Sequence, residues 1–314
     1  MEDRVVVLGA AGFIGSHLCE QLLLENYEVL GIDAFIDESY PRVIKQKNIA
    51  KSLLHPNFSF MEFNLMDQIS TDTFRENDVI INEAAMPGLP LSWTNSKFYF
   101  ESNTFIPINV LSNLEGLRIK KFIQISTSSV YGKFAVGDEH LPLQPISPYG
   151  VSKLSAEFMV SNLCNNLEIP YNTLRYFSVF GPRQRPDMAY SQIIRKCIAG
   201  DEIEIFGDGK QSRTNTFVSD IVSGTIQTIS KGISGEIYNL AGNQSINLLE
   251  VIDFIRMNLD SKSKIKFSKP RQGDQRQTEG IFTKATSQLG YLPVVDFWEG
   301  LEMQIKWHCA EVSF

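Results

Sequence analysis

The sequence changes from a strand pattern to a helix pattern at Val7-Leu8-Gly9-Ala10-Ala11-Gly12-Phe13-Ile14-Gly15. An apolar run over residues 4–9 leads into this stretch, and residues 13–26 carry apolar side chains at helical spacing. Gly9 permits a tight turn, Gly12 lets the backbone approach a pyrophosphate, and Gly15 lets the helix pack close to the strand. The helix N-terminus adds free N–H groups and a positive dipole end. The stretch therefore predicts a dinucleotide-binding turn.

The second predicted strand, residues 28–32, leads directly into Asp33. An acidic residue at this distance from the glycine turn accepts hydrogen bonds from the adenosine ribose hydroxyls. The extra 2′-phosphate of NADP would meet Asp33 as a like charge, and Ala34 and Phe35 offer no arginine to offset it. The sequence therefore predicts NAD as the cofactor, in preference to NADP.

Apolar and helical segments alternate along the first half of the chain. They predict strands over 28–32, 58–63, 78–82, 121–126 and 171–176, and helices over 94–116 and 148–168. Apolar strands without strict alternation, separated by helices, are typical of a parallel sheet covered on both faces. We therefore expect a doubly wound, Rossmann-like parallel α/β sheet that binds its ligands beyond the carboxyl ends of the strands.

The second half of the chain contains more loop-forming residues. Helices are predicted there over 188–200, 219–231, 247–259 and 296–310, and no linker separates the two halves. We expect a smaller α/β substrate lobe interleaved with the first domain. The NAD-binding domain would comprise 1–176, with about 214–242 returning to it, and the substrate lobe 177–213 and 243–314.

The composition excludes several protein classes. The 314 residues carry a formal net charge of −7, whereas a general nucleic-acid binder would usually carry a basic face. The four cysteines are scattered without metal-ligand spacing, so no metal is expected. Neither a signal region after Met1 nor an apolar run of the ~20 residues that a membrane span needs is present. We expect a cytoplasmic protein that does not bind membranes.

Tyr149 and Lys153 lie one turn apart on a predicted helix, for which Ser147 is a suitable N-cap and Pro148 a suitable first residue. Tyrosine has an ordinary pKa of about 10 and is a poor base near neutrality. A nearby ammonium and the positive nicotinamide of NAD would both lower that pKa. On their own, the two residues would more simply be a surface pair.

A run of hydroxyl side chains, Ser126-Thr127-Ser128-Ser129, lies at the end of the strand predicted over 121–126. A hydroxyl at this carboxyl end could hydrogen-bond the oxygen that Tyr149 deprotonates and stabilise it as charge develops. A serine run alone is usually a loop. Together with Tyr149 and Lys153, it favours a catalytic site.

With these segments in order, the chain resembles an extended short-chain dehydrogenase/reductase of the NAD-dependent epimerase/dehydratase family, and most closely the UDP-glucuronate 4-epimerases. The segments that carry the resemblance are Gly9–Gly15, Asp33, Asn82–Ala85, Thr127–Gly132, Tyr149–Lys153, Arg175–Met188, Gly207–Arg213 and Arg271–Asp274. The resemblance implies that Tyr149 is the catalytic base, Lys153 its electrostatic partner, and Thr127 the hydroxyl beside the reacting oxygen.

The resemblance also implies the contacts of both ligands. NAD would contact Gly9, Gly12, Phe13, Ile14, Gly15, Asp33, Asn64, Leu65, Ala84, Ala85, Asn103, Tyr149, Lys153 and Tyr176. The UDP-sugar would contact Ser128, Ser129, Ser178, Arg185, Arg213, Arg271 and Asp274, with Arg213 and Arg271 on the diphosphate. Three positions depart from the usual family pattern: Asn82-Glu83 replaces His-Leu, Asn64 replaces an aspartate, and Pro90 replaces an arginine.

The pair Ser128-Ser129 restricts the type of reaction that the site could catalyse. Dehydratases of the family carry Asp-Glu at these positions, and decarboxylases commonly carry glutamate at the second. A hydroxyl cannot replace a carboxyl acid or base, which leaves oxidation and reduction at C4. We expect NAD-dependent C4 epimerisation of a UDP-sugar, most closely UDP-glucuronate to UDP-galacturonate. UDP-glucose or UDP-N-acetylglucosamine as substrate, a 4-keto-sugar reductase, and a non-catalytic NAD sensor stay open as alternatives.

The family often forms homodimers through the two helices that here span 94–116 and 148–168, and we expect a homodimer. Leu111, Leu114, Phe158 and Leu163 could contribute to that helical bundle or belong to the core.

Overall fold

A central sheet of seven parallel strands organises the computed structural model, which describes residues 4–38 and 40–312. The strand order is β12-β7-β5-β4-β1-β2-β3. The strands are β1 (Arg4–Leu8), β2 (Glu28–Asp33), β3 (Phe58–Glu62), β4 (Val79–Asn82), β5 (Lys121–Thr127), β7 (Tyr171–Tyr176) and β12 (Ile237–Leu240). The order reverses between β1 and β4, as in doubly wound sheets, where ligands bind at this switch point. The predicted fold class is confirmed.

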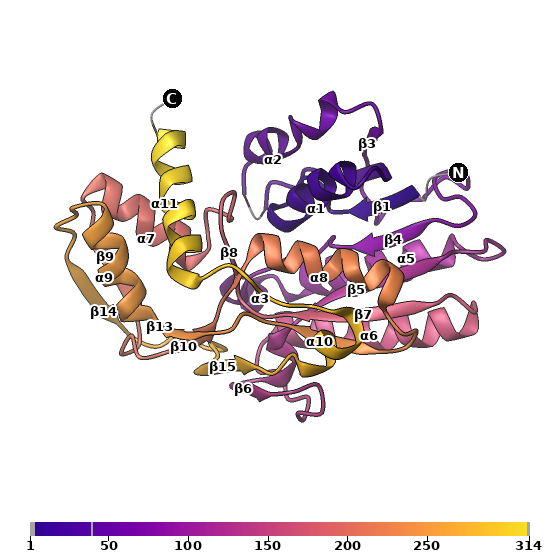
Figure 1. The fold of residues 1–314 in the computed structure, drawn as a ribbon. Helices are drawn as coiled ribbons and strands as arrows, with labels where there is room; N and C mark the ends of the chain where they lie inside the picture. Colours follow the sequence, from indigo (N-terminus) through magenta and orange to yellow (C-terminus); the bar gives the residue numbers. More distant parts are fainter. Residues whose placement is uncertain (1–3, 39, 313–314) are drawn as a thin grey trace.

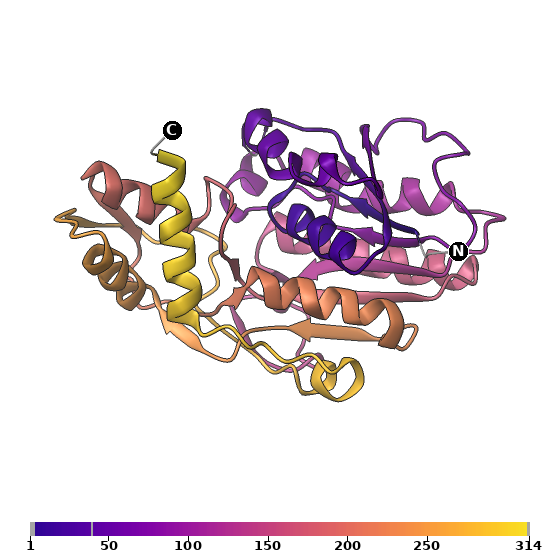
Figure 2. The same ribbon diagram turned by 45° about the horizontal axis from the view of Figure 1, so that its top comes forward.

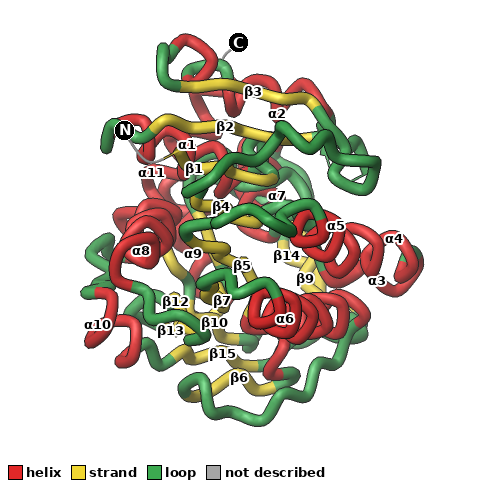
Figure 3. The backbone as a smooth tube through the Cα atoms, turned by 90° about the vertical axis from the view of Figure 1, so that its right-hand side faces the viewer, coloured by secondary structure: helices red, strands yellow, loops and turns green. Residues whose placement is uncertain are grey.

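Both faces of the sheet are covered, which explains why its strands read as continuous apolar runs. From β1, Val5 and Val7 pack in a core shared with α1 (Phe13–Leu24) and α8 (Val218–Lys231). Val6 and Leu8 pack on the other face in a core shared with α5 (Ile106–Ser112) and α6 (Pro148–Asn166). Figure 3 shows these two helix layers on opposite sides of the sheet.

The helix predicted over 94–116 is present over residues 96–112, but it is not a regular α-helix. The segment forms α3 (Leu89–Thr94), α4 (Ser96–Phe100), a π-helical turn η2 (Glu101–Phe105) and α5. Pro107 lies in the first turn of α5, and a proline has no N–H to donate to the carbonyl four residues earlier. A regular α-helical ladder therefore cannot run through this point.

The other predicted helices are present within two residues at each end, as α6, α7 (Ala189–Ala199), α8, α9 (Leu248–Asn258) and α11 (Phe297–Val312). Two short helices, α2 (Arg42–Ile49) and α10 (Thr283–Leu289), escaped prediction, as did the short turns η1 (Ser52–Leu54) and η3 (Ser128–Tyr131).

A smaller body lies beside the main sheet, on the left of Figures 1 and 2. It contains α7, α9, α11 and the parallel pair β9 (Ile203–Phe206) and β14 (Ile265–Ser268). Two small sheets join distant parts of the chain. One has the order β13 (Ser245–Asn247), β10 (Ser212–Thr214), β15 (Gln277–Gly280) and β6 (Phe134–Gly137), and the other pairs β11 (Thr216–Phe217) with β8 (Val179–Phe180). Between these segments, α8 and β12 return to the main sheet, where β12 pairs with β7.

Candidate active site

The glycine turn connects β1 to α1 at the switch point of the sheet. Gly9 has a φ of +82°, and a Cβ there would lie 2.8 Å from the Ala84 nitrogen. A Cβ on Gly15 would lie 2.2 Å from the Gly9 carbonyl oxygen. No side chain of the described residues caps α1, and its first turn carries no acidic residue. Its N–H groups are therefore available to an anion, and the turn fits the pyrophosphate of NAD.

Asp33 ends β2 beside this turn. Its carboxylate accepts hydrogen bonds from the Phe35 N–H at 2.8 Å and the Ala11 N–H at 3.0 Å. Burial raises the pKa of this carboxyl, while these hydrogen bonds and the charge of Lys45 act in the opposite direction. The two backbone donors fix the carboxylate next to the glycine turn, as a ribose-binding acid requires.

Three further residues that are predicted to contact NAD form contacts within the protein itself. Asn103, in η2, accepts a hydrogen bond from the Met86 N–H at 2.6 Å and donates to the Ser152 hydroxyl at 2.9 Å. It thereby ties the segment after Ala84 and Ala85 to α6. Leu65 is buried in the core, and the Asn64 side chain accepts from the Met66 N–H at 3.1 Å. Direct contacts of Asn64, Leu65 and Asn103 with NAD stay predictions.

Tyr149 and Lys153 lie in the first two turns of α6, which begins where the sequence predicts. The Ser147 hydroxyl caps the helix by accepting from the Gly150 N–H at 3.1 Å. Thr127 ends β5, and its hydroxyl acts to lower the pKa of Tyr149. The structure thus brings the three predicted catalytic residues, Thr127, Tyr149 and Lys153, to one place, where Thr127 and Lys153 are buried and Tyr149 is half-buried.

The electrostatics of this trio differ from the sequence expectation. Burial raises the pKa of Tyr149 above its ordinary value, and the Thr127 hydroxyl and the charge of Arg185 only partly counter it. Burial also lowers the pKa of Lys153 to about 8, against the opposing charges of Glu83 and Glu157. Without cofactor, Tyr149 is therefore held as the neutral phenol. Forming the tyrosinate needs a further positive charge nearby.

A cavity of about 260 Å³ is lined mainly by residues of α7, β9 and the segment around β10. Its lining includes four predicted substrate residues, Ser178, Arg213, Arg271 and Asp274. The Arg271 guanidinium lies 3.5 Å from the centre of the Phe206 ring. Burial lowers the pKa of Arg213 and raises that of Asp274, whose opposite charges act against both shifts. Two guanidinium groups in one cavity suit a diphosphate.

The other predicted substrate residues connect this cavity to the trio. Arg185 forms an ion pair with Asp187 at 2.8 Å, and Asp187 lines the cavity. Ser128 and Ser129 are buried in η3, directly after Thr127. The described residues that line the cavity do not include the trio, and the link between them is Arg185, whose charge acts on Tyr149 while its partner Asp187 lines the cavity.

Gln275 is a site residue that the sequence analysis missed. Its amide donates to the carbonyl oxygens of Ser128 at 3.1 Å and Gly132 at 2.8 Å. Its main-chain carbonyl oxygen accepts a hydrogen bond from the Arg213 guanidinium. Gln275 thereby joins the hydroxyl turn to a cavity arginine. Its position next to Asp274 was the only signal in the sequence.

The comparisons with known proteins agree with this geometry. The model of the NAD-dependent epimerase/dehydratase family matches residues 5–241. The chain belongs to this family.

Several known proteins are similar to this chain over nearly its whole length. The chain is 37% identical to YtcB of Bacillus subtilis, named an uncharacterized UDP-glucose epimerase, over 97% of each chain. It is 31% identical to a UDP-glucuronate 4-epimerase of Thermodesulfobacterium geofontis, covering 96% of this chain and 95% of that one. Among solved structures, UDP-glucuronic acid 4-epimerase of Bacillus cereus, in complex with UDP-glucuronic acid and NAD, matches with a TM-score of 0.95 and 36% identity. That match covers 98% of this chain and 99% of the other.

The predicted family, the NAD cofactor and the enzyme class are thus confirmed for this epimerase/dehydratase family member. Within residues 4–38 and 40–312, no helix combines the length and apolarity needed to cross a bilayer. In the same part of the chain, no group of three or more His, Cys, Asp or Glu side chains could hold a metal ion.

Proposed function

We propose that this protein catalyses the NAD-dependent C4 epimerisation of a UDP-sugar, with UDP-glucuronate and UDP-galacturonate as the interconverted pair. The observation that carries the proposal is the Thr127–Tyr149–Lys153 trio, of which Thr127 and Lys153 are buried, beside a cavity with two arginines. The relatives named for UDP-sugar epimerisation support it. We further propose that residues 1–176 and 214–242 serve NAD, and that 177–213 and 243–314 serve the nucleotide sugar.

Tyr149 accepts the proton of the C4 hydroxyl in the proposed reaction, and Thr127 donates a hydrogen bond to the same oxygen. Bound NAD supplies the hydride acceptor and, later, the hydride donor. The protonated Lys153, together with that positive ring, lowers the pKa of Tyr149 from its raised value in the unbound protein. When hydride returns to the opposite face, Tyr149 returns its proton to the new hydroxyl.

Epimerisation requires the 4-keto sugar to turn while the nucleotide stays bound. Arg213 and Arg271 would hold the diphosphate firmly, and Asp274 the uridine ribose, all within one cavity. Ser128, Ser129 and Ser178 would offer only neutral hydroxyls to the sugar. Such donors can hold a C6 carboxylate without fixing a single ring orientation.

UDP-glucose is the main alternative substrate, because the same hydroxyls would tolerate a CH2OH group and one relative is named for UDP-glucose. Separate incubation with UDP-glucuronate, UDP-glucose and UDP-N-acetylglucosamine, followed by proton NMR, distinguishes the substrates. We expect UDP-galacturonate from UDP-glucuronate without added NADH. A dependence on stoichiometric NADH would instead identify a reductase, and release of carbon dioxide a decarboxylase.

Arg271→Leu should raise KM for the UDP-sugar about ten- to hundredfold, because a charge-assisted hydrogen bond contributes about 1.5–3 kcal/mol. Turnover at saturation and NAD binding should change little. Steady-state kinetics measure KM and turnover, and the NAD content of the purified protein measures cofactor binding. Arg256→Gln is the matched control, because Arg256 pairs with Asp253 on the helix α9, away from the cavity lining. An unchanged KM in Arg271→Leu would contradict the assignment.

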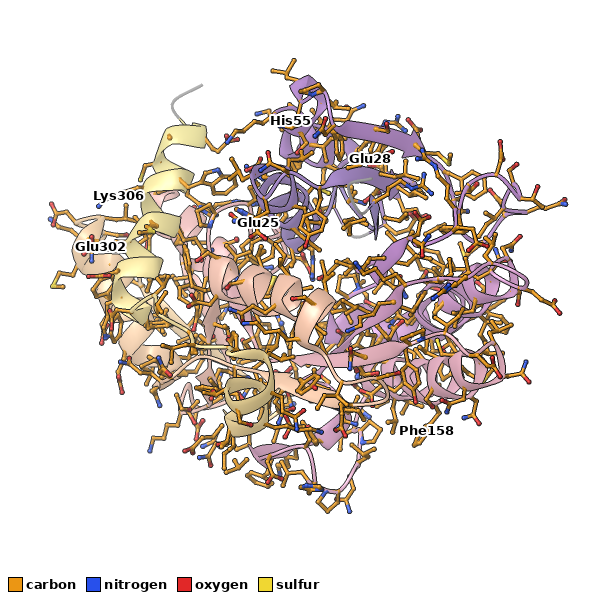
Figure 4. All side chains as sticks on the ribbon, turned by 45° about the vertical axis from the view of Figure 1, so that its right-hand side comes forward. Glu25, Glu28, His55, Phe158, Glu302 and Lys306 are labelled. Atoms are coloured by element: carbon orange, nitrogen blue, oxygen red, sulfur yellow. The ribbon has the colours of Figure 1, made fainter. Side chains whose placement is uncertain are left out.

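We also propose a homodimer formed through the α5–α6 face. Leu111 and Leu114 are less than 2% exposed in the monomer core and are not available to a partner. Phe158 is 57% exposed on α6, and Figure 4 shows it pointing away from the molecule. Phe105, on the neighbouring η2, is also 57% exposed. These side chains form an apolar face that a second copy would cover.

Phe158→Asp should therefore halve the molar mass in solution, because it places a charge within the proposed interface. Size-exclusion chromatography with light scattering measures the mass. Phe134→Asp alters an equally exposed phenylalanine on β6 and should leave the mass unchanged. If Phe158→Asp keeps the wild-type mass, α6 does not form the interface.

A further inference from the structure

Glu83 is a carboxylate that the proposed reaction does not use. It follows β4 at the carboxyl edge of the sheet, where its N–H donates to the Leu8 carbonyl oxygen at 3.0 Å. A Cβ on Gly9 would lie 3.0 Å from the Glu83 carbonyl carbon. Glu83 therefore lies directly against the glycine turn, inside the NAD site.

The Glu83 side chain is held in place by a neutral group, the hydroxyl of Tyr176. It accepts a hydrogen bond from the Tyr176 hydroxyl at 3.0 Å, and that hydroxyl lies 2.6 Å from the Thr225 hydroxyl. Thr225 in turn donates to the Ile221 carbonyl oxygen at 2.7 Å within α8. Among the described residues, no cation lies within 4 Å of the Glu83 carboxylate as an ion-pair partner. Its charge is positioned but not neutralised by contact.

The groups that face Glu83 come from several elements. Lys153 and Tyr149 from α6, Tyr176 from β7 and Cys19 from α1 all interact with its charge. Burial raises the pKa of Glu83 to about 7, while Tyr176 and Lys153 pull it down. The carboxyl thus ionises near neutrality, and a positive charge brought beside it would favour the ionised form.

The reactive ring of the cofactor must lie near this charge. Hydride leaves the carbon whose hydroxyl Tyr149 deprotonates, so the nicotinamide ring must lie beside Tyr149. Tyr176, whose hydroxyl binds Glu83, ends β7 at the position paired with Thr127, and the charge of Glu83 acts on both Tyr149 and Lys153. The oxidised nicotinamide is a cation and the reduced ring is neutral, so a nearby carboxylate stabilises only the oxidised form.

We propose that the Glu83 carboxylate, anchored by Tyr176, makes the cofactor site prefer NAD⁺ over NADH. This preference would return hydride to the 4-keto sugar and keep the enzyme from remaining reduced between turnovers. The inference depends on NAD as the cofactor and not on which sugar is epimerised. It can therefore be tested without any sugar.

The test is a partition measurement on the whole protein. Wild type and Glu83→Gln are equilibrated at pH 8 with defined mixtures of NAD⁺ and NADH, freed of unbound nucleotide and denatured, and the released cofactors are quantified. Glutamine keeps an acceptor for Tyr176 but removes the charge. We expect the bound NAD⁺/NADH ratio to fall about ten- to hundredfold in Glu83→Gln, the size of one charge interaction over about 6–12 Å at an effective dielectric constant of about 20.

Two further measurements distinguish an effect of the Glu83 charge from an effect of Glu83 on packing. Glu83→Asp retains the charge, so its ratio should stay within about threefold of wild type, whereas a packing role would alter both variants alike. As the pH falls below 7, the Glu83 carboxyl takes up its proton first in the NADH complex and at lower pH in the NAD⁺ complex, so the wild-type ratio should fall toward that of Glu83→Gln. Equal ratios for wild type and Glu83→Gln at pH 8 would overturn the proposal. Failed epimerisation of every sugar would leave these ratios unaffected and would count only against the proposed reaction.

Discussion

Replacing Tyr149 with phenylalanine should lower turnover about 10²- to 10⁴-fold, because the variant loses the only hydroxyl proposed as the base. The ring itself should stay in place, since it packs edge-on against Tyr99 with 6.3 Å between ring centres. Product formation by proton NMR and the bound NAD released on denaturation measure activity and cofactor content separately. We expect a large loss of the first and little change in the second.

Tyr171→Phe is the matched control for this variant. Tyr171 begins β7, at the end of the strand opposite the site, so removing its hydroxyl should leave turnover near wild type. Undiminished turnover in Tyr149→Phe would remove Tyr149 from its catalytic role. Equal losses in both variants would point to a general effect on stability.

Arg175→Met should lower the free energy of unfolding by about 3–5 kcal/mol, because it leaves a buried carboxylate without its partner. Arg175 is 1% exposed and donates to both Glu157 oxygens, at 3.0 and 2.7 Å. It also donates to the Tyr131 hydroxyl at 2.9 Å. Urea unfolding of the NAD-bound protein measures the loss.

Removing both charges tests the reason for that loss. The double variant Arg175→Met/Glu157→Leu should be more stable than Arg175→Met alone, because no buried charge is then left unpaired. Wild-type stability in the single variant, or a further loss in the double variant, would contradict the explanation. Since Glu157 also supports the charge of Lys153, the double variant should lower the pKa of that lysine even where the fold recovers.

Features that depend on neighbouring residues were predictable from the sequence. The glycine turn, Asp33 and the start of α6 follow from local backbone chemistry, and all three are found where the sequence places them. The parallel sheet follows from strands that are apolar on both faces. The π-helical turn within the helix predicted over 94–116 was missed, although Pro107 was a visible warning.

Features that depend on packing between distant segments were not predictable. Arg175 and Glu157 meet only because β7 lies against α6, and Gln275 reaches Ser128 across 147 positions of sequence. The burial of Leu111 and Leu114 likewise depends on which face of α5 the sheet covers. The sequence marked Glu83 only as a departure from the family pattern, and its partner Tyr176 emerged from the fold.

The return of α8 and β12 to the main sheet has a practical consequence for engineering substrate choice. Cavity residues Ser178, Arg213 and Arg271 lie on both sides of this returning segment, so a single crossover in the gene cannot transfer them without also transferring α8 and β12. A chimera with a relative would need at least three junctions, one before Ser178, one between Arg213 and α8, and one after β12. With fewer junctions, a strand from one parent would have to pair with the sheet of the other.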